Sequence, residues 1–306
     1  MQKKLKWAIG LLGCFIALSV GYNLYYKAID GFRLGNVRGA VTYDPAWKVK
    51  STKEQEAQVK ALLRQPFTYL GKGGQAYAFE SEDGRYVLKL LKFKFLRPKI
   101  TNRLISFIPF LEDKVTNDLQ WRQKKFYELY QGYKWAYQLN KEGSGLIYLH
   151  FNPTFNQFGA VTLYDKLGRQ HTLELDQVAF IIQEKGRLLD QLLNEKLSSK
   201  DIEGAKILLN RFFDAVVFQY NKGLYDRDYG HVHNAGFVAN RPIHIDMGKI
   251  TYDPRMKEKS SQNADLKLIL ARLDKWLIRY HPQVAGILIS SITTHLQQQG
   301  LMEKHD

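Results

Sequence analysis

The chain has 306 residues, a length that suits one two-lobed domain or two small domains with a sizeable buried core. Charged residues make up 25% and aromatic residues 13% of the chain, which is typical of a folded protein and excludes disorder for its bulk. The formal net charge of +15 favours anionic partners such as nucleotides, phospholipid headgroups or acidic proteins. Common nucleic-acid-binding motifs are missing, so a nucleic-acid partner is not expected. The single cysteine, Cys14, excludes an internal disulfide and a cysteine-based zinc site.

A basic start, Met1–Lys6, precedes an uncharged and mostly apolar segment from Trp7 to Tyr26. Its length is enough to cross a bilayer as a helix, and we expect a single-pass membrane anchor over residues 1–26. A cleaved secretory signal and a lipoprotein signal with Leu11–Cys14 as lipobox are the alternatives. Basic residues flank both ends of the segment, so the charge pattern leaves its orientation open. In residues 27–55 the apolar residues show no sustained helical or strand spacing, and this segment is expected to be a linker.

Residues 53–63 show a weak helical pattern, and three short apolar runs follow it up to Leu91. The first two runs flank a turn rich in glycine: Gly71, Gly73 and Gly74. The third run, Tyr86–Leu91, contains one lysine, Lys89. This order predicts an antiparallel sheet with a glycine-rich flap. Glycine lets backbone N–H groups approach phosphate oxygens closely, and a lysine on a rigid strand can deliver a cation to the same phosphates.

The segment from residue 91 to residue 117 is basic and irregular, and we expect a solvated loop, a lid or a membrane-facing segment there. A long helix is predicted over residues 111–139. Further strands, which complete a five- or six-stranded sheet, are predicted at 145–151, 160–164, 172–175 and 178–183. Helices are predicted at 188–197, 202–220, 264–280 and 284–299, with a polar loop at 256–263.

A polar stretch with Asp226, Asp228 and Asn234 follows the helix over 202–220. Two short apolar runs then predict a β-hairpin that ends at Asp246. Because the strands of a hairpin fold back on each other, Asn234 and Asp246 should lie close together. Oxygen ligands that converge in this way suit a Mg²⁺ ion that carries phosphate oxygens. A polar loop that ends in a turn-forming aspartate is the plainer alternative.

Four motifs in this order resemble those of the protein-kinase-like superfamily. They are the glycine-rich turn, the strand lysine, the Asp-Arg-Asp…Asn stretch and the Asp-Met-Gly triplet. The resemblance is nearest to its atypical kinases and covers residues 67–252. It implies that Asp228, or alternatively Asp226, orients an acceptor hydroxyl group. It also implies that Asn234 and Asp246 bind Mg²⁺ and that the strand lysine and the glycine-rich turn hold the phosphates of ATP.

The same resemblance implies two further contacts with the nucleotide site. Glu128, with Glu112 as the second choice, would pair with the strand lysine from the long helix. Residues 183–186, which include Glu184, would form the hinge beside the adenine. Both expectations depend on the family pattern alone.

Three features depart from that pattern. Ala76 stands where the third glycine of the loop is expected, and five residues, not four, separate Asp228 from Asn234. No Ala-Pro-Glu segment and no long activation segment follow Asp246. The last departure favours an atypical kinase and weakens any argument that the acceptor is a protein.

The expected fold class is α+β. It is a bilobal kinase-like fold with an antiparallel N-lobe sheet, a reduced and mainly helical C-lobe, and an N-terminal transmembrane helix. The expected divisions are the anchor and linker given above, a kinase-like N-lobe over 56–183 and a kinase-like C-lobe over 184–306.

The expected function is a membrane-anchored phosphotransferase that moves the γ-phosphate of ATP, with Mg²⁺, to a hydroxyl group on a protein, lipid or small molecule. Because ATP is the donor, the kinase-like part is expected on the cytoplasmic side. Two alternatives are kept. One is a pseudokinase that binds nucleotide or a partner without catalysis, and the other is a membrane-anchored envelope or host-interaction protein with no nucleotide site.

Overall fold

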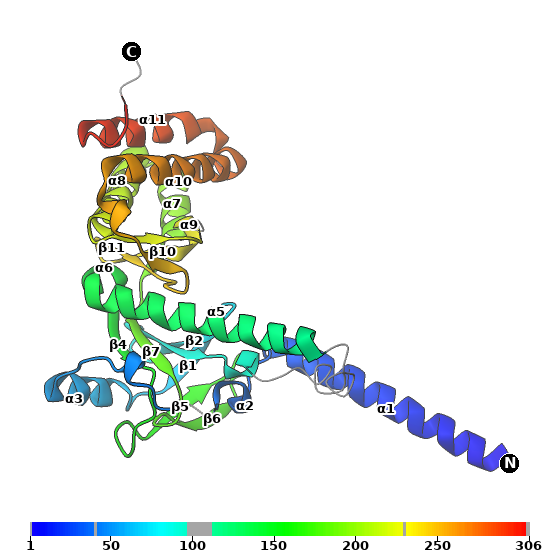
Figure 1. Cartoon of the computed structure of the whole chain (residues 1–306). Coiled ribbons are helices and arrows are strands. Elements are labelled where there is room, and N and C mark those ends of the chain that lie inside the picture. The colour runs from blue at the N-terminus through cyan, green and yellow to red at the C-terminus, as the bar shows by residue number, and fades with distance from the viewer. Residues whose placement is uncertain (1, 40–41, 97–111, 229–230, 304–306) are drawn as a thin grey trace. The chain divides into compact units, whose positions relative to one another are not determined.

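The computed structural model describes residues 2–39, 42–96, 112–228 and 231–303. The chain divides into two compact units, each built from separate parts of the sequence. The first unit contains Met1–Arg97 and His150–Phe180, and the second contains Pro98–Leu149 and Ile181–Asp306. Helices and strands are both abundant (Figure 1), so the predicted α+β class is confirmed. The predicted limits of anchor, linker and lobes stay predictions.

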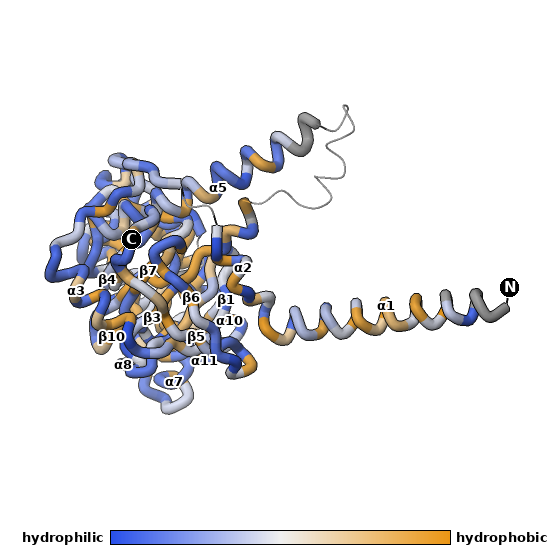
Figure 2. Tube along the Cα trace, turned by 90° about the horizontal axis from the view of Figure 1, so that it is seen from below, coloured by the Kyte–Doolittle hydropathy of each residue, from blue (hydrophilic) through white to orange (hydrophobic). Residues whose placement is uncertain are grey.

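The first unit begins with helix α1 (Gln2–Ala28). Residues Ile9–Ala28 are long and apolar enough to cross a membrane, and none of this stretch is buried inside the protein. Large apolar side chains along it, such as Leu11, Phe15 and Leu18, are exposed. Figure 2 shows apolar residues in orange along the projecting helix. A signal sequence near the N-terminus has the same properties.

The sheet of the first unit is built around the predicted glycine-rich turn. Its strands follow the order β3 (Tyr86–Leu91), β2 (Ala76–Ser81), β1 (Phe67–Lys72), β5 (Ala160–Tyr164) and β6 (Gln170–Glu174). The pairs β1–β2, β2–β3 and β5–β6 are antiparallel as predicted, whereas β1 and β5 are parallel. Pairing of β1 with β2 shifts register between Tyr69 and Gly71, where the chain enters the turn. The remaining elements of this unit are α2 (Leu34–Val37), η1 (Pro45–Trp47), α3 (Lys53–Leu62) and η2 (Phe93–Leu96).

Burial alternates along β2 but is continuous along β3. In β2, Tyr77 and Phe79 are fully buried and their neighbours are half-buried. In β3, five consecutive residues from Val87 to Leu91 are buried, so both faces of this strand are covered. Lys89 is one of them, with 8% of its surface exposed.

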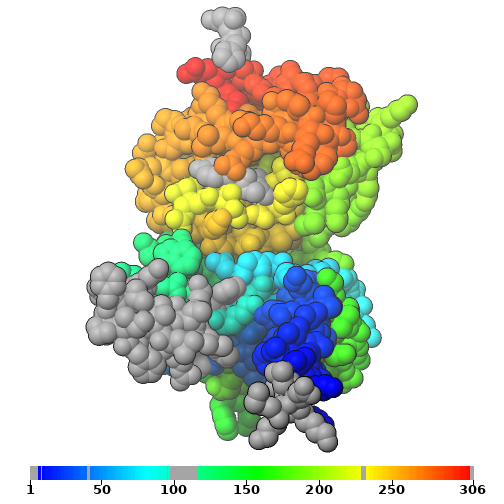
Figure 3. Space-filling model, turned by 90° about the vertical axis from the view of Figure 1, so that its right-hand side faces the viewer, coloured from blue at the N-terminus to red at the C-terminus, as the bar shows by residue number. Residues whose placement is uncertain are grey.

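Part of the segment expected to be a linker packs into this unit. Ile29, Phe32 and Val37 are at most 1% exposed. The ring of Phe32 lies edge-on to Tyr77 with centroids 5.3 Å apart, and the Tyr77 hydroxyl donates to the carbonyl of Gly31 at 2.6 Å. The chain therefore passes from α1 into the core within a few residues. Figure 3 shows the exposed surface of the N-terminal part of the chain in dark blue.

The second unit begins in its described part with helix α5 (Glu112–Leu139), as predicted, followed by α6 (Lys141–Ser144). Strands β4 (Leu146–His150) and β7 (Phe180–Glu184) are hydrogen-bonded neighbours. A helical core then forms from α7 (Leu189–Ser198), α8 (Ile202–Asn221), α10 (Lys259–Tyr280) and α11 (Pro282–Gln298). Small sheets join β8 (Arg187–Leu188) to β10 (Ala235–Val238) and β11 (Arg241–His244), and β9 (Leu224–Asp226) to β12 (Ile250–Tyr252). Short helices are α9 (His231–Asn234) and η4 (Pro254–Lys257).

The predicted polar loop over 256–263 is wrong, because η4 occupies its start and α10 already begins at Lys259. One polar residue there, Gln262, is buried. Gln262 is 2% exposed, and its amide donates to Asn221 Oδ1 and to the Met256 carbonyl, each at 3.0 Å. Satisfied hydrogen bonds allow this polar side chain to be buried. Of the basic segment after residue 91, positions 97–111 lie outside the described residues.

Candidate functional site

The polar stretch begins at a tight turn after α8. Gly223 has φ +74°, in the left-handed region, and a Cβ added there would lie 2.8 Å from the Tyr252 ring. Both constraints favour glycine. The turn leads into β9, which pairs antiparallel with β12 so that Asp226 lies opposite Ile250. The stretch before Asp228 and the stretch after the Asp-Met-Gly triplet are therefore fixed to each other.

Asp228 and Asp226, the two candidates for orienting the acceptor hydroxyl, have different surroundings. Asp226 is 1% exposed, its Oδ1 accepts the Asp228 backbone N–H at 2.8 Å, and its Oδ2 lies 3.3 Å from His244 Nε2. Asp228 has 35% of its side chain exposed, and its Oδ1 accepts from Lys249 Nζ at 2.7 Å. Solvent therefore reaches the carboxylate of Asp228, whereas that of Asp226 lies inside the loop.

The predicted hairpin is present and brings the backbone of Asn234 close to the residues just before Asp246. Ala235 pairs with His244, and the Ile245 N–H donates to the Asn234 carbonyl at 2.7 Å. Asn234 also directs its side-chain amide towards Asp228 Oδ2, at 3.5 Å. Asp246 follows directly after this pairing, and its Oδ1 accepts the Gly248 N–H at 3.0 Å.

Helix α5 packs closely against the Asp-Met-Gly triplet. A Cβ added at Gly132 would lie 2.4 Å from the Met247 carbonyl oxygen and 3.1 Å from that of Ile250. The next residue, Tyr133, is buried beside the same segment, and burial followed by the charge of Asp246 raises its pKa well above the ordinary value. Only glycine at position 132 allows the helix and the triplet to approach this closely. The helix thus fixes the backbone that carries Asp246.

Glu128 on the same helix lies beside the polar stretch. Its Oε2 is 3.0 Å from Lys125 Nζ and 3.6 Å from the Arg227 guanidinium. Burial alone would raise the pKa of Glu128, but Lys125 and Arg227 together hold that pKa below its ordinary value. Its expected partner, Lys89, belongs to the other unit, so that pairing stays a prediction.

The glycine-rich turn in the first unit contains glycines that the fold itself does not demand. None of the three has a positive φ. A Cβ added at Gly71, Gly73 or Gly74 would meet no atom within 4 Å among the described residues. The space over this turn is therefore open to a ligand that approaches the backbone.

Lys92, which is not among the residues predicted for the site, supports this turn. The side chain is 4% exposed, Nζ donates to the Gly73 carbonyl at 2.5 Å, and it lies 4.4 Å from the centre of the Tyr77 ring. Burial, followed by the nearby charges of Lys94 and Lys72, lowers the pKa of Lys92 to about 8. Its signal in the sequence was a second lysine that continues the apolar run after Lys89.

The segment expected to be the hinge has its polar groups bonded within the second unit. The Glu184 N–H donates to the Gly145 carbonyl at 2.8 Å, and its carboxylate pairs with Arg241. Gln183 is buried, and its amide donates to the carbonyls of Ser144 and His244 at 2.6 and 2.8 Å. Contact of Glu184 with a nucleotide stays a prediction.

No group of three or more His, Cys, Asp or Glu side chains that could hold a metal ion is found within the residues that the structure describes. Asn234 and Asp246 provide one amide and one carboxylate, and these two side chains alone do not supply a complete coordination shell. Magnesium commonly binds through one or two carboxylates plus substrate phosphates. The donor set fits a Mg²⁺ ion that arrives with a nucleotide.

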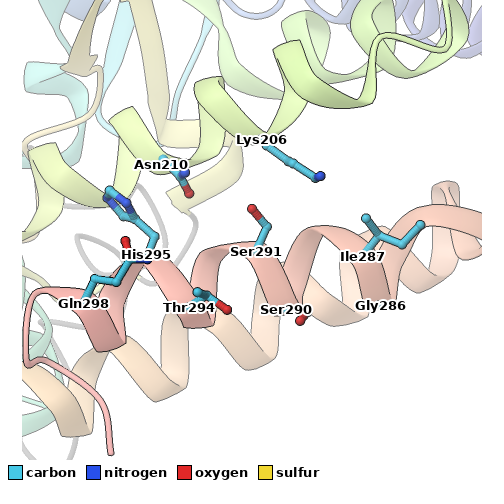
Figure 4. Close-up of a pocket in the computed structure, with 9 residues that line it drawn as sticks. All are labelled: Lys206, Asn210, Gly286, Ile287, Ser290, Ser291, Thr294, His295 and Gln298. Atoms are coloured by element: carbon cyan, nitrogen blue, oxygen red, sulfur yellow. The ribbon is translucent and has the colours of Figure 1, made fainter. Parts of the chain in front are cut away.

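A different hollow, an open groove of about 700 Å³, lies between α8 and α11. Figure 4 shows Lys206 and Asn210 of α8 facing Ser291 and His295 of α11. Its charged groups are paired, since Lys206 contacts Glu203 and His295 contacts Asp214, both at 2.7 Å. The groove contains none of the motif residues and is an ordinary polar surface between helices.

No protein-family model matches the chain, and no curated protein matches it. Solved structures with similarity include WbdD, a bifunctional kinase-methyltransferase, at 15% identity and TM-score 0.36. The alignment covers 78% of this chain and 47% of WbdD, so the chain spans about half the length of that protein.

Two further structures are similar. Rv3197 from Mycobacterium tuberculosis, in complex with erythromycin, has 12% identity and TM-score 0.31, over 86% of this chain and 74% of that one. APH(2")-IIa, in a ternary complex with streptomycin and ATP, has 14% identity and TM-score 0.27, over 82% and 97%. TM-scores of this size do not establish a fold by themselves. The order of elements predicted from the sequence is confirmed: a sheet with a glycine-rich turn, a long helix, then a helical unit with the polar stretch and hairpin.

Proposed function

We propose that the chain is an atypical kinase-like phosphotransferase that uses Mg²⁺-ATP and is anchored to a membrane by α1. The observation that carries the proposal is the arrangement in the second unit. An accessible carboxylate, Asp228, lies beside the Asn234 amide, and the hairpin brings Asn234 next to the segment with Asp246.

Each residue has a role that its position supports. Asp228 is the group that orients and accepts the proton of the hydroxyl acceptor, and Lys249 holds the carboxylate of Asp228 in place from 2.7 Å. Asn234 and Asp246 are the ligands for Mg²⁺, which neutralises charge on the phosphates when bound. The glycine-rich turn and Lys89 hold the phosphates from the first unit. Positioning of this kind supplies most of the rate enhancement in phosphoryl transfer.

The test is ATP turnover by the full chain in detergent or lipid nanodiscs, with circular dichroism to verify folding. Asp246→Asn and Lys89→Met should abolish Mg²⁺-dependent turnover while the helical signal is kept. Asp228→Asn should lower turnover by at least about a hundredfold and leave nucleotide binding intact. Asp226→Asn should act mainly on stability. Wild-type turnover in Asp246→Asn or Asp228→Asn would contradict these roles.

A second candidate is a pseudokinase, and the five-residue spacing between Asp228 and Asn234 is the observation that favours it. Thermal shift with Mg²⁺-ATP and a phosphate-release assay separate the two. Binding with no turnover in the wild-type chain supports the pseudokinase. If neither is observed, both candidates fail and a membrane-anchored interaction protein without a nucleotide site remains.

We propose that the kinase-like part lies on the cytoplasmic side of the membrane, because ATP is available there. Exposed apolar residues along Ile9–Ala28 support the anchor. Extraction of membranes with alkaline carbonate tests it, because an integral protein stays in the pellet and a peripheral one is released. A shortened product that is released from the membrane would indicate a cleaved signal sequence instead.

A further inference from the structure

The C-terminal end of α1 is surrounded by cations that stack on its tyrosines. The Arg33 guanidinium lies 4.6 Å from the centre of the Tyr22 ring and 5.2 Å from that of Tyr26. Lys94 Nζ lies 5.8 Å from the centre of the same Tyr26 ring, and it donates to the Tyr26 hydroxyl at 3.3 Å. Each contact is a cation–π interaction of ordinary geometry.

A third cation reaches the helix from a distant part of the sequence. The Arg169 guanidinium lies 5.0 Å from the centre of the Tyr25 ring and donates to its hydroxyl at 3.1 Å. Arg169 belongs to the turn between β5 and β6, whereas Arg33 follows α1 and Lys94 follows β3. We call these three residues, Arg33, Lys94 and Arg169, the basic collar. Three separate segments of the first unit thus place positive charge around one end of one helix.

Two acidic side chains among the described residues of this unit, Asp30 and Asp165, have partners outside the collar. Asp30 lies between Lys72 and Lys166, at 3.1 and 3.0 Å. Asp165 is 2% exposed and lies 2.8 Å from His171 Nε2. Neither carboxylate pairs with a collar side chain, and Arg33, Lys94 and Arg169 each carry a positive charge.

The collar lies where a membrane surface would be if α1 spans a bilayer. Tyrosine is enriched at the level of lipid headgroups, and Tyr22, Tyr25 and Tyr26 end the apolar part of the helix. At the tip of the neighbouring turn, Leu167 has 49% of its surface exposed between Lys166 and Arg169. An exposed apolar residue flanked by cations suits the boundary between headgroups and acyl chains.

We propose that the basic collar binds the headgroups of anionic phospholipids in the leaflet next to the C-terminal end of α1. The proposal rests on the membrane anchor proposed above but not on phosphotransfer. The chemistry that selects the lipid is charge, because phosphatidylglycerol carries a net negative charge whereas phosphatidylcholine carries none. The tyrosine rings hold the cations at headgroup depth before any lipid binds, which lowers the conformational cost of binding.

Electron spin resonance of spin-labelled lipids tests this with the full chain reconstituted in phosphatidylcholine vesicles. The spectrum separates lipids restricted by the protein from free lipids, for spin-labelled phosphatidylglycerol and for spin-labelled phosphatidylcholine. In the wild-type chain the restricted fraction should be larger for phosphatidylglycerol, and this preference should weaken as salt is raised. The wild-type measurement needs no variant to fold.

The triple variant Arg33→Gln, Lys94→Gln, Arg169→Gln should lose the preference, by up to about fivefold for each charge removed. The control variant Lys267→Gln, Lys275→Gln, Arg279→Gln makes the same change in net charge on exposed residues of α10 and should keep it.

The proposal is overturned if the wild-type chain restricts both lipids equally. It is also overturned if the control variant loses the preference for phosphatidylglycerol as much as the collar variant does. A chain that carbonate releases from the vesicles refutes the anchor instead. ATP turnover plays no part in either result.

Discussion

Replacement of Gly132 by alanine is the sharpest test of how α5 positions the candidate site. The added Cβ would lie 2.4 Å from the Met247 carbonyl oxygen, about 1 Å closer than an ordinary contact between these atoms, and 3.1 Å from the Ile250 carbonyl oxygen. Both obstacles are backbone atoms, so no side chain can rotate away. Either the helix or the Asp-Met-Gly triplet must move.

Two opposing effects set the magnitude. Overpacking of this kind costs about 3 kcal/mol, near the upper end for an inserted methyl group, because the neighbours are rigid. Alanine in a helix interior recovers about 1 kcal/mol relative to glycine. We expect Gly132→Ala to lower the free energy of unfolding by about 2 kcal/mol. Mg²⁺-ATP affinity should fall too, because Asp246 follows the displaced backbone.

The matched control is Gly286→Ala in α11. There the added Cβ would meet no atom within 4 Å among the described residues, so only the helix-propensity gain of about 1 kcal/mol should appear. Urea unfolding of the full chain in detergent, followed by tryptophan fluorescence, measures both variants. Trp135 reports on the region directly, since its ring lies 6.2 Å from that of Tyr252. If Gly132→Ala is stabilised as much as Gly286→Ala, the close packing of α5 on the triplet is refuted.

Two predictions concern pH. Burial lowers the pKa of Lys92 to about 8, so the unfolded chain binds more protons between about pH 8 and 10.5, and wild-type stability should rise across that window by at most about 3 kcal/mol. Lys92→Met should lack this rise in urea unfolding at a series of pH values, and an identical pH profile in the two proteins would contradict the buried charge. Burial also lowers the pKa of His150, so the stability that its neutral form provides is lost as pH falls below about 6.5. His150→Gln should show a shallower loss of thermal stability between about pH 6.5 and 5 than wild type, and a loss as steep as that of wild type would refute the assignment.

Local patterns predicted most of the elements correctly. Two short apolar runs predicted the hairpin from Ala235 to Ile245, and its turn needs only a positive φ at Ala239, +52° in the structure. Strands β1–β3 around the glycine-rich turn followed from three short apolar runs in the same way. The relation between Asn234 and Asp246 was predictable because a hairpin imposes it, whatever surrounds the strands.

Features that depend on contacts distant in sequence were not predictable. Asp226 and Asp228 are alike as residues, yet only Asp226 is buried, with its Oδ2 at 3.3 Å from His244 Nε2. Phe32 lies in a segment with no regular spacing of apolar residues, yet its ring packs edge-on against the rings of Tyr77 and Phe79. Nothing in the residues near Gly132 indicates that the Met247 carbonyl lies against it.

Only a few residues join α1 to the packed core, and this short connection limits how far the first unit can move relative to α1. A flexible tether allows a domain to search a volume that grows with the length of the tether. Here the Gly31 carbonyl already accepts a hydrogen bond from Tyr77 in the sheet, and Phe32 is packed beside it. With α1 in a bilayer, the glycine-rich turn would keep a fixed height above the lipid. Acceptors would then have to come to that height, either by lateral diffusion within the membrane or by collision with its surface.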